Sequence, residues 1–556
     1  MGHWLLSGHN SRETFTICYP IDGSYFRTHA TGPQMGEILS FLLGDAGRLD
    51  LSMPLLLTVE GRMYLNMTYL ARNASLVFPL DPTSLGLPKE LRGLVTPHGK
   101  PRLTTLLPVP FRFLRFYRRT MAAYRQAIPR HRAKMGGIYW QLRACRDGQL
   151  AEEDLVQTAP LFERATLEDM AILMRVVMLM GLLSIAAIDL MNRKAPALLS
   201  LLVGRGTSTA LLGERMWELG QVAAQCGAET ADLLRRGEVD LAKYRAISEA
   251  APFLAALDRF LRTYGHRAFH DASEMDAVRL ADQPELVLLT VGGLLEESEP
   301  PAVRAEAARQ VSQRALREMN PLRRFLWRLL LKWGSGFVER REEGRDVFEL
   351  QHAAYGLAAR VLSRHHFPGH PDDTLFFYGF AEYLAFGQSR GQRRVDPEEI
   401  EQRRAKMEEQ RRQPGPPELI WYDPETEAWW PVDETPKQVV RAFEGRLGGI
   451  AASAGSGPVE GVALVTGSAE EAARRLLETS GPVVLVTHVT DPVWSSIFRR
   501  LTAVVTEMGG VMSHAATVAR ENGIPAVVGV SDATRWIRDG QRVRVDGATG
   551  LVEVLD

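Results

Sequence analysis

Cysteine is scarce in this 556-residue sequence, and its charges almost cancel. The three cysteines, Cys18, Cys145 and Cys226, are widely spaced, which excludes a disulfide framework and a cysteine-based zinc site. They suggest a reducing compartment, so we expect a cytoplasmic protein. The net charge of −1 provides no overall basic field. We therefore expect neither nucleic acid nor a membrane as a partner.

Long apolar runs and export signals are also lacking. The most apolar segment, Met170 to Met191, is interrupted by Arg175 and Asp189. The uninterrupted apolar stretch is about a dozen residues long, short of the ~20 residues that a bilayer requires. We interpret it as a helix buried in a large bundle rather than as a membrane span. Met1 to Leu6 has neither the basic start nor the apolar core of a signal peptide.

The length exceeds what one hydrophobic core supports, so several domains are expected. The patterns predict a multidomain protein of the α plus α/β type, with a large, mostly helical domain followed by a C-terminal β/α domain. Residues 1–105 form a mixed N-terminal region that packs on the helical domain. Residues 106–445 form the helical domain with a linker arm, and residues 446–556 form the last domain. The small residues from Gly448 to Gly457 predict a hinge.

Within the last domain, one stretch carries a chemical signal. Ala503 to Thr506 is typical of a buried strand, Gly509-Gly510 of a turn, and Ser513 to Asn522 of a helix, which places His514 at the helix start. A glycine turn leading into a helix N-terminus is an anion site, because backbone N–H groups and the helix dipole favour negative charge. A histidine at that position can accept a phosphoryl group.

The phosphate site predicted from these residues has four members. The N–H groups of the glycine loop hold phosphate oxygens, and two hydroxyls can donate to them; the predicted residues are Gly509, Gly510, Ser513 and Thr506. Glu507 either orients the imidazole of His514 or is a solvated carboxylate. Arg520 lies near the opposite face of the helix and is expected to be structural.

The stretch around His514 resembles the phosphohistidine swivelling domain of the phosphoenolpyruvate (PEP)-utilising enzymes. The resemblance includes Thr490-Asp491-Pro492, Thr506-Glu507 and the closing segment Val545 to Gly550. It implies that His514 carries the phosphoryl group. An ordinary core or surface histidine is the alternative.

The central region is similar to the helical acceptor domain of the rifampin phosphotransferases. The matching segments are Tyr264-Gly265-His266-Arg267 with Glu274, Arg341 to Arg345, and Asp372 to Phe377 with Glu382. The resemblance implies that His266 is a catalytic base and that the acceptor site is formed by Arg267, Glu274, Arg341, Glu342 and Arg345. A buried ion network that holds helices together is the alternative for these residues.

Two parts of the related enzymes are not found in this sequence. It has no glycine-rich phosphate loop followed by Lys and Mg²⁺-binding carboxylates, and no pyruvate-binding barrel follows the swivelling domain. We expect no metal and no tightly bound cofactor in this chain. A separate ATP-grasp partner, holding ATP and Mg²⁺, is expected to load His514, and a small or mid-sized, partly apolar molecule is expected to be the acceptor.

Two other functions remain possible at this stage. One is a phosphohistidine relay that passes phosphate to another protein. The other is a kinase with an unrecognised nucleotide site of its own.

Overall fold

The computed structural model describes two compact units. The described residues are 4–7, 18–25, 31–43, 53–72, 109–146, 158–195, 198–202, 208–268, 274–295, 301–413, 416–417, 419–432, 446–455, 457–479, 481–490, 494, 497–509, 513–530 and 532–555. Unit 1 comprises Met1–Ala186, Asp271–Ala277 and Glu343–Thr435. Unit 2 comprises Ala187–His270, Val278–Glu342 and Pro436–Asp556.

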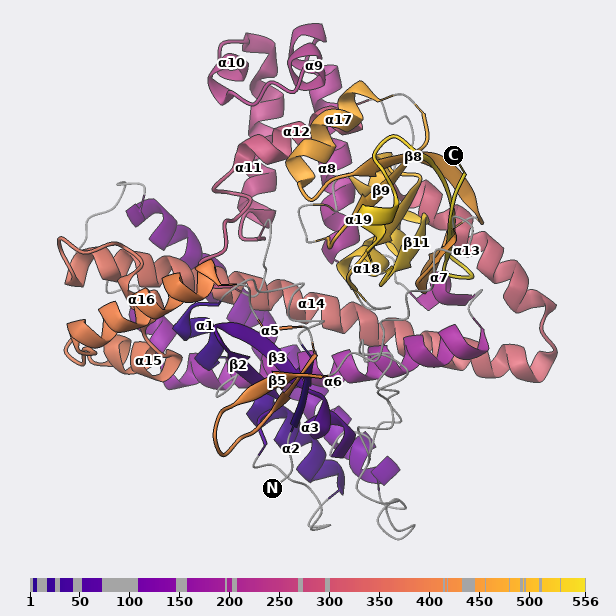
Figure 1. Cartoon of the computed structure of the whole chain (residues 1–556). Coiled ribbons are helices and arrows are strands. Elements are labelled where there is room, and N and C mark those ends of the chain that lie inside the picture. The colour runs from indigo at the N-terminus through magenta and orange to yellow at the C-terminus, as the bar shows by residue number, and fades with distance from the viewer. Residues whose placement is uncertain are drawn as a thin grey trace. The chain divides into compact units, whose positions relative to one another are not determined.

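Unit 1 contains a five-stranded sheet of order β2-β3-β1-β4-β5 (Figure 1). Its strands are β1 (Trp4–Ser7), β2 (Leu56–Val59), β3 (Arg62–Asn66), β4 (Leu419–Tyr422) and β5 (Trp429–Pro431). β2 and β3 form a hairpin. Its turn residues Glu60 and Gly61 both have positive φ, as a tight two-residue turn requires. The aromatic arm around Trp429 joins this sheet through β4 and β5, and Trp429 Nε1 donates to Glu60 Oε1 at 2.9 Å.

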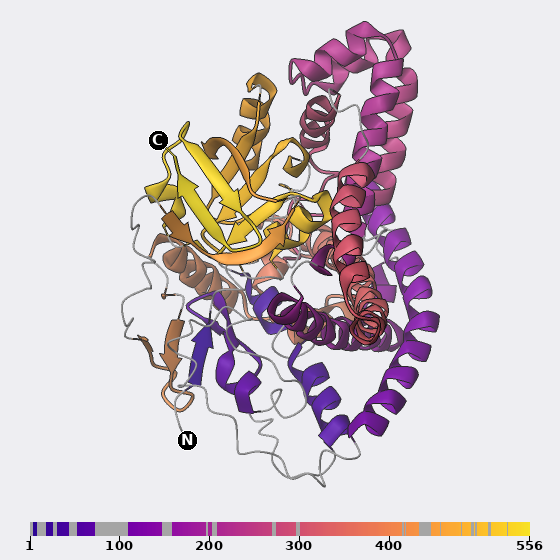
Figure 2. The ribbon, with the colours of Figure 1, turned by 90° about the vertical axis from the view of Figure 1, so that its right-hand side faces the viewer.

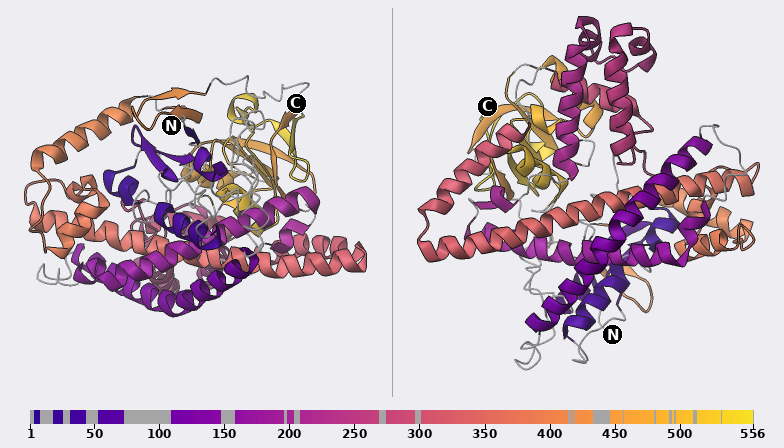
Figure 3. Two further views of the ribbon diagram at one scale, coloured as in Figure 1. Left: turned by 90° about the horizontal axis from the view of Figure 1, so that it is seen from below. Right: turned by 180° about the vertical axis from the view of Figure 1, so that it is seen from behind.

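Helices form most of the remaining described part of unit 1, and Figure 3 shows the longest of them, α5, α6 and α14. The helices are α1 (Pro20–Tyr25), α2 (Thr31–Leu43), α3 (Met67–Arg72), α5 (Val109–Arg146), α6 (Arg164–Lys194), α14 (Pro321–His366), η8 (Thr374–Phe377), α15 (Phe380–Gln388) and α16 (Pro397–Arg412). α6 and α14 each continue into unit 2. α16 is a solvated, highly charged helix, and only Ile400 and Met407 are buried along it.

α6 is the apolar helix noted in the sequence. Among the described residues, it is the one helix whose length and composition would allow it to cross a membrane, over Arg164–Ile188. Its most apolar window is 47% buried inside the structure, and Arg175 in that window forms an ion pair of 2.6 Å with Glu37. A core helix of a folded domain has the same properties, and the packing of α6 within unit 1 agrees with that interpretation.

The helices of unit 2 precede its sheet in the sequence. They are α7 (Leu199–Leu202), α8 (Ser208–Gln225), α9 (Ala228–Arg235), α10 (Leu241–Arg245), η7 (Ser248–Ala250), α11 (Ala251–Tyr264), α12 (Pro284–Leu294) and α13 (Pro301–Glu318). A core cluster that includes Leu219, Tyr244, Phe253 and Val291 holds α8 to α12 together.

The second sheet of the molecule has eight strands in the order β6-β13-β12-β8-β9-β10-β11-β7, and Figure 2 shows it in yellow and orange. Its strands are β6 (Arg446–Gly448), β7 (Ile450–Ala454), β8 (Val459–Val465), β9 (Val483–Thr487), β10 (Ala503–Thr506), β11 (Pro525–Val528), β12 (Arg542–Asp546) and β13 (Leu551–Val554). β6 and β7 lie at opposite ends of this order, yet only Gly449 separates them in the chain. The sheet therefore curls round on itself, which explains why one core cluster, with Val486, Val505 and Val545, lies inside it.

Short helices cover the outside of this curled sheet. They are α17 (Ala469–Glu478), η10 (Phe498–Arg500) and α18 (His514–Asn522). Ala533 of α19 (Ala533–Trp536) belongs instead to the inner core cluster. A second core cluster, with Leu476, Phe498, Ala516 and Ile524, fills the space between the helices and the outer face.

The predicted fold class is confirmed, because a mostly helical region precedes a β/α domain. The predicted hinge from Gly448 to Gly457 is wrong. Most of that segment belongs to β6 and β7, which are hydrogen-bonded to β13 and β11. Small residues occur there because the backbones approach closely: a Cβ on Gly455 would lie 2.4 Å from the Pro525 ring. The domain boundaries proposed from the sequence remain a prediction.

Candidate functional site

The candidate site lies where three parallel strands of unit 2 end. β9, β10 and β11 run side by side, with Val505 opposite Val486 and Val527. The carboxyl ends of parallel strands share one edge of a sheet, and ligands bind there in many α/β folds. α18 follows β10 at this edge.

α18 begins at His514 because the residue before it caps the helix. The Ser513 side chain accepts a hydrogen bond from the Ala516 N–H at 3.3 Å, which satisfies one of the unpaired donors of the first turn. The helix ends at Gly523, whose left-handed conformation (φ 66°) closes the last turn. Both ends of the helix are therefore set by local sequence, and His514 occupies its first turn.

The imidazole of His514 is half-buried and held from two sides. Its Nδ1 lies 3.1 Å from the Oγ1 atom of Thr490, a buried residue that follows β9. The edge of the ring meets the Phe498 ring at a centroid distance of 6.0 Å and an angle of 85°. One ring nitrogen is thus engaged by the domain's own hydroxyl. Thr490 was part of the sequence resemblance, but no role was assigned to it there.

The predicted phosphate-binding residues are described in part. Gly509 has φ 123°, a conformation that favours glycine, and its carbonyl oxygen lies close to Gly529. Gly510 lies outside the described residues. Ser513 caps α18, and Thr506 is fully buried, with its hydroxyl donating to the Met508 carbonyl at 2.7 Å. Thr506 must rotate its hydroxyl before it can donate to a phosphate, whereas Ser513 still has its hydroxyl proton for that purpose.

Glu507 does not contact His514 in the described structure. Its Oε2 lies 2.7 Å from the Nδ1 of His488, and its Oε1 accepts hydrogen bonds from both the N–H and the hydroxyl of Thr534. Burial alone would raise the pKa of Glu507, but the hydrogen bonds from His488 and Thr534 outweigh burial and hold the pKa below its ordinary value. Glu507 is therefore an ionised carboxylate that orients His488. Sequence reasoning missed His488, because nothing in the linear order places it beside Glu507.

Arg520 has the structural role expected for it. Its Nη1 donates to the Ala452 carbonyl at 3.1 Å, and the side chain is buried. This contact ties α18 to β7.

The residues predicted for the acceptor site are divided between the two units. His266, Arg267, Arg341 and Glu342 belong to unit 2, and Glu274 and Arg345 belong to unit 1. All of them lie in described segments.

His266 and Arg267 lie in the turn that follows α11, and both side chains are buried. The turn is fixed by backbone hydrogen bonds: Leu280 N–H donates to the Arg267 carbonyl at 2.8 Å, and Ala281 N–H donates to the Gly265 carbonyl at 3.0 Å. These hydrogen bonds fix the backbone that carries the His266 imidazole. They agree equally with a catalytic base and with a residue that packs the helices.

The three residues on α14 take part in ion pairs along that helix. Arg341 lies 3.6 Å from Glu342, whose side chain is almost fully buried. Arg345 lies 3.3 Å from Glu349, one turn further along. Such pairs agree with the ion-network alternative, although they leave a role toward an acceptor possible.

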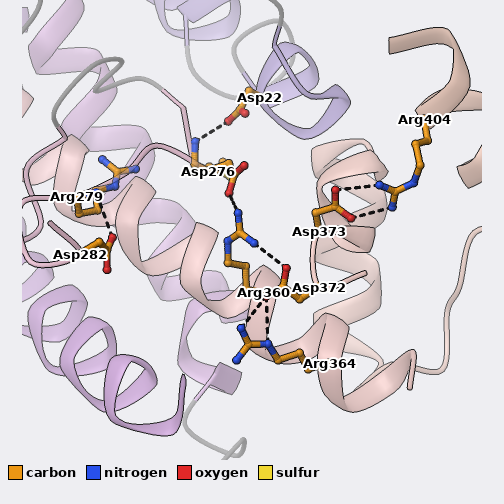
Figure 4. Close-up of polar contacts among 10 residues, drawn as sticks. Asp22, Asp276, Arg279, Asp282, Arg360, Arg364, Asp372, Asp373 and Arg404 are labelled. Carbon is orange, nitrogen blue, oxygen red and sulfur yellow. Dashed lines mark hydrogen bonds and ion pairs between the residues drawn. The ribbon is translucent and has the colours of Figure 1, made fainter. Parts of the chain in front are cut away.

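The motif around Asp372 and Asp373 has a clear structural role in unit 1 (Figure 4). Arg360 pairs with Asp276 and with Asp372, the latter at 2.7 Å, and Arg404 forms a double hydrogen bond with Asp373. Burial raises the pKa of Asp276, with Arg360 opposing that effect. Glu382 accepts from the Gly379 N–H and binds Arg403 through both oxygens. These ion pairs hold η8, α15 and α16 against α14.

No metal centre is found among the described residues, where no three His, Cys, Asp or Glu side chains group in a way that could hold an ion.

Two parts of the chain match known protein families. Residues 479–550 match the mobile domain of PEP-utilising enzymes, and residues 170–342 match the fourth domain of rifampicin phosphotransferase. The resemblance noted in the sequence is thereby confirmed over these two segments.

Individual relatives agree with the family match. A rifampicin phosphotransferase from Streptomyces sp is 50% identical over 112 residues, which is 20% of this chain and 12% of the relative. One from Bacillus cereus is 51% identical over 100 residues, 18% of this chain and 11% of the relative. A phosphoenolpyruvate synthase from Aeropyrum pernix is 40% identical over 136 residues, which is 24% of this chain and 16% of the relative. The chain thus spans less than a fifth of the length of each of these relatives.

Proposed function

We propose that this chain is the phosphohistidine and acceptor-binding part of a dikinase-type phosphotransferase. The observation that carries the proposal is the position of His514 in the first turn of α18, with Nδ1 held by Thr490, within a mobile domain of the PEP-utilising enzymes. The phosphoryl group is carried on His514 from ATP, bound with Mg²⁺ to a separate ATP-grasp partner, to a hydroxyl group of a small or mid-sized, partly apolar acceptor.

The contact with Thr490 suggests which ring nitrogen reacts. When Nδ1 carries the proton and donates it to Thr490 Oγ1, Nε2 has an unshared electron pair and is the nucleophile. Nε2 attacks the phosphorus atom, the bond from phosphorus to the nucleotide oxygen breaks, and the nucleotide leaves with that electron pair. The N-terminus of α18 and the Ser513 hydroxyl favour the incoming negative charge.

In the second half-reaction, the acceptor hydroxyl attacks the phosphorus and loses its proton, and the Nε2–phosphorus bond breaks. We assign proton removal to His266. Arg267, Glu274, Arg341, Glu342 and Arg345 are proposed to bind the acceptor or to neutralise the phosphate. These assignments are supported by the resemblance of the segments that carry the residues to the acceptor domain of the related enzymes. The family match over residues 170–342 covers part of these segments.

The two half-reactions are tested separately. The chain is incubated with Mg²⁺, ATP and a candidate ATP-grasp partner, and acid-labile phosphate is measured; acceptor candidates are then added and its loss is followed. His514→Ala is expected to abolish loading. His266→Ala is expected to load normally and to retain the phosphate when the acceptor is added. Normal turnover by a stable His266→Ala variant would place the base elsewhere.

The relay function is a second candidate, because His514 is half-buried on the surface of its domain. It predicts that phosphate leaves His514 for another protein and for no small molecule. The same chase experiment, carried out with protein fractions in place of small acceptors, distinguishes the two. A cytoplasmic location remains an expectation.

A further inference from the structure

α14 has apolar side chains on two opposite faces of its first part. Leu331 and Val338 are buried in a core cluster of unit 2 with Met191, Leu198 and Leu316. The opposite face carries five large apolar side chains that are 47–69% exposed: Leu322, Phe325, Leu326, Leu329 and Trp333. We call these five residues the apolar stripe.

The spacing of the stripe places it on one side of the helix. Its members are separated by three, one, three and four residues, which at 100° per residue spans an arc of roughly 100°. Over this length the stripe extends about 17 Å along the helix axis. The other side of the helix already supplies the core contacts, so the stripe is not required to bury this helix in its unit. Exposed apolar residues that occur singly are common, but a contiguous row of this kind marks an interaction surface.

The charges around the stripe have a single sign. No acidic residue occurs between Glu318 and Glu339, whereas this interval holds Arg323, Arg324, Arg328 and Lys332. By the helical angles, Arg323 lies on one side of the stripe and Arg328 and Lys332 lie on the other, and these three side chains are exposed.

Arg324 has a different role from the other three. It donates to the Arg317 and Met319 carbonyls and so closes the C-terminal end of α13. α13 and the start of α14 meet at this point (Figure 1), and Arg314 and Arg317 on α13 add two more exposed cations near it. Glu318, the last residue of α13, is also exposed, so the end of this helical pair is basic because cations outnumber carboxylates there, although the whole chain has a net charge of −1.

We propose that the apolar stripe docks on an anionic membrane surface, with Phe325 and Trp333 entering the headgroup boundary and the flanking cations contacting acidic lipids. A helix with Leu, Phe and Trp on one face and only Arg and Lys beside them has the composition of an interfacial helix. This docking does not depend on phosphoryl transfer, and it departs from the expectation that no membrane partner exists. That expectation was based on the net charge of the chain and on the lack of a membrane-spanning segment. Neither property shows whether cations are concentrated on one helix.

Charge disfavours the other occupants. A second copy placed on the stripe would bring the same cations of two chains together, which is repulsive. A protein partner would have to present acidic groups at matching positions along both sides of the stripe. A lipid surface with uniform negative charge complements flanks of a single positive sign.

Vesicle sedimentation of the purified full chain tests the proposal. At low salt the wild-type chain is expected to sediment with phosphatidylglycerol-rich vesicles and not with phosphatidylcholine vesicles, and added salt is expected to weaken binding. Phe325→Glu with Trp333→Glu should reduce binding by about tenfold or more, and so should Arg328→Gln with Lys332→Gln.

The matched control changes two exposed aromatic side chains elsewhere. Trp430→Glu with Trp536→Glu alters side chains that are 37% and 52% exposed and should leave binding unchanged. Thermal unfolding of each variant, compared with wild type, establishes that the fold is kept. Absence of wild-type binding to anionic vesicles, or equal binding by the stripe and control variants, would overturn the proposal. So would a dimer in solution that the stripe variant alone disrupts, because a second copy would then be the occupant.

Discussion

At the scale of single residues, the Thr490 hydroxyl contacts Nδ1 of the His514 ring at 3.1 Å. Thr490→Val keeps the size of the side chain and removes the hydroxyl, so Nδ1 loses its partner. We expect the rate of His514 phosphorylation to fall about tenfold, in proportion to one hydrogen bond of roughly 1.4 kcal/mol, with little change in stability. Thr490→Ser is the control and should restore most of the rate. Equal rates for the Val and Ser variants would show that the contact does not orient the ring.

Glu507 gives a prediction about pH. Its pKa in the folded protein lies below the ordinary value, so its contribution to stability is present above the unfolded carboxyl pKa of about 4.3 and is lost as pH falls through the folded pKa. Glu507→Gln should therefore reduce the free energy of unfolding by about 1–2 kcal/mol at neutral pH. The difference in free energy of unfolding between Glu507→Gln and wild type should disappear at acidic pH. Denaturant unfolding at several pH values measures it.

A carboxylate on the surface of the same sheet serves as the control for Glu507. Glu460 pairs with Arg542 at 3.1 Å, and its side chain is 47% exposed. Glu460→Gln should change stability little at any pH, because exposed ion pairs contribute little. A pH-independent cost of Glu507→Gln would show that shape, rather than charge, is what Glu507 provides.

At the scale of elements, the ion pair between Asp373 and Arg404 joins η8 to α16. A double-mutant cycle with Asp373→Ala and Arg404→Ala should give a coupling energy of about 1 kcal/mol, because the pair is doubly hydrogen-bonded and partly buried. Loading of His514 should be unaffected. The weaker pair between Arg412 and Glu408, at 3.9 Å on exposed side chains, should show almost no coupling. Loss of loading in the Asp373→Ala variant at unchanged stability would instead indicate a functional role.

Elements were predicted well wherever their signals are local. Helical spacing from Ser513 to Asn522 and Gly523 as a stop predict α18, and in the structure the helix begins one residue later, at His514, because Ser513 caps it. The hinge prediction failed because small residues permit two outcomes, a loose linker or close backbone packing. Only the pairing of β6 with β13 and of β7 with β11 distinguishes them. The His488–Glu507 pair was not predictable for a related reason, since it joins residues that end two different strands.

At the scale of the whole molecule, the chain is proposed to depend on a partner for its nucleotide. The purified chain alone should show negligible binding of ATP with Mg²⁺ in calorimetry, because its sequence contains no phosphate-cradling loop of the expected type. The same chain with His514→Ala is the control and should give the same trace. Micromolar affinity in both samples would mean that the chain has its own nucleotide site.

Fold class could be predicted at this scale, whereas the arrangement of the acceptor residues could not. Helical periodicity and glycine turns predict local structure only. They could not predict that Glu274 and Arg345 belong to one compact unit and His266 to the other. Likewise, the net charge of −1 averages over 556 residues and hides the basic end of α13 and α14.

The central claim is that His514 carries the phosphoryl group. After incubation with Mg²⁺, ATP and the ATP-grasp partner, peptides of the chain are mapped by mass spectrometry under alkaline conditions that preserve phosphohistidine. The account predicts one labelled peptide, containing His514, in wild type and in a His488→Ala variant, and no label in His514→Ala. Label that persists in His514→Ala, or that resides on another histidine, would contradict it.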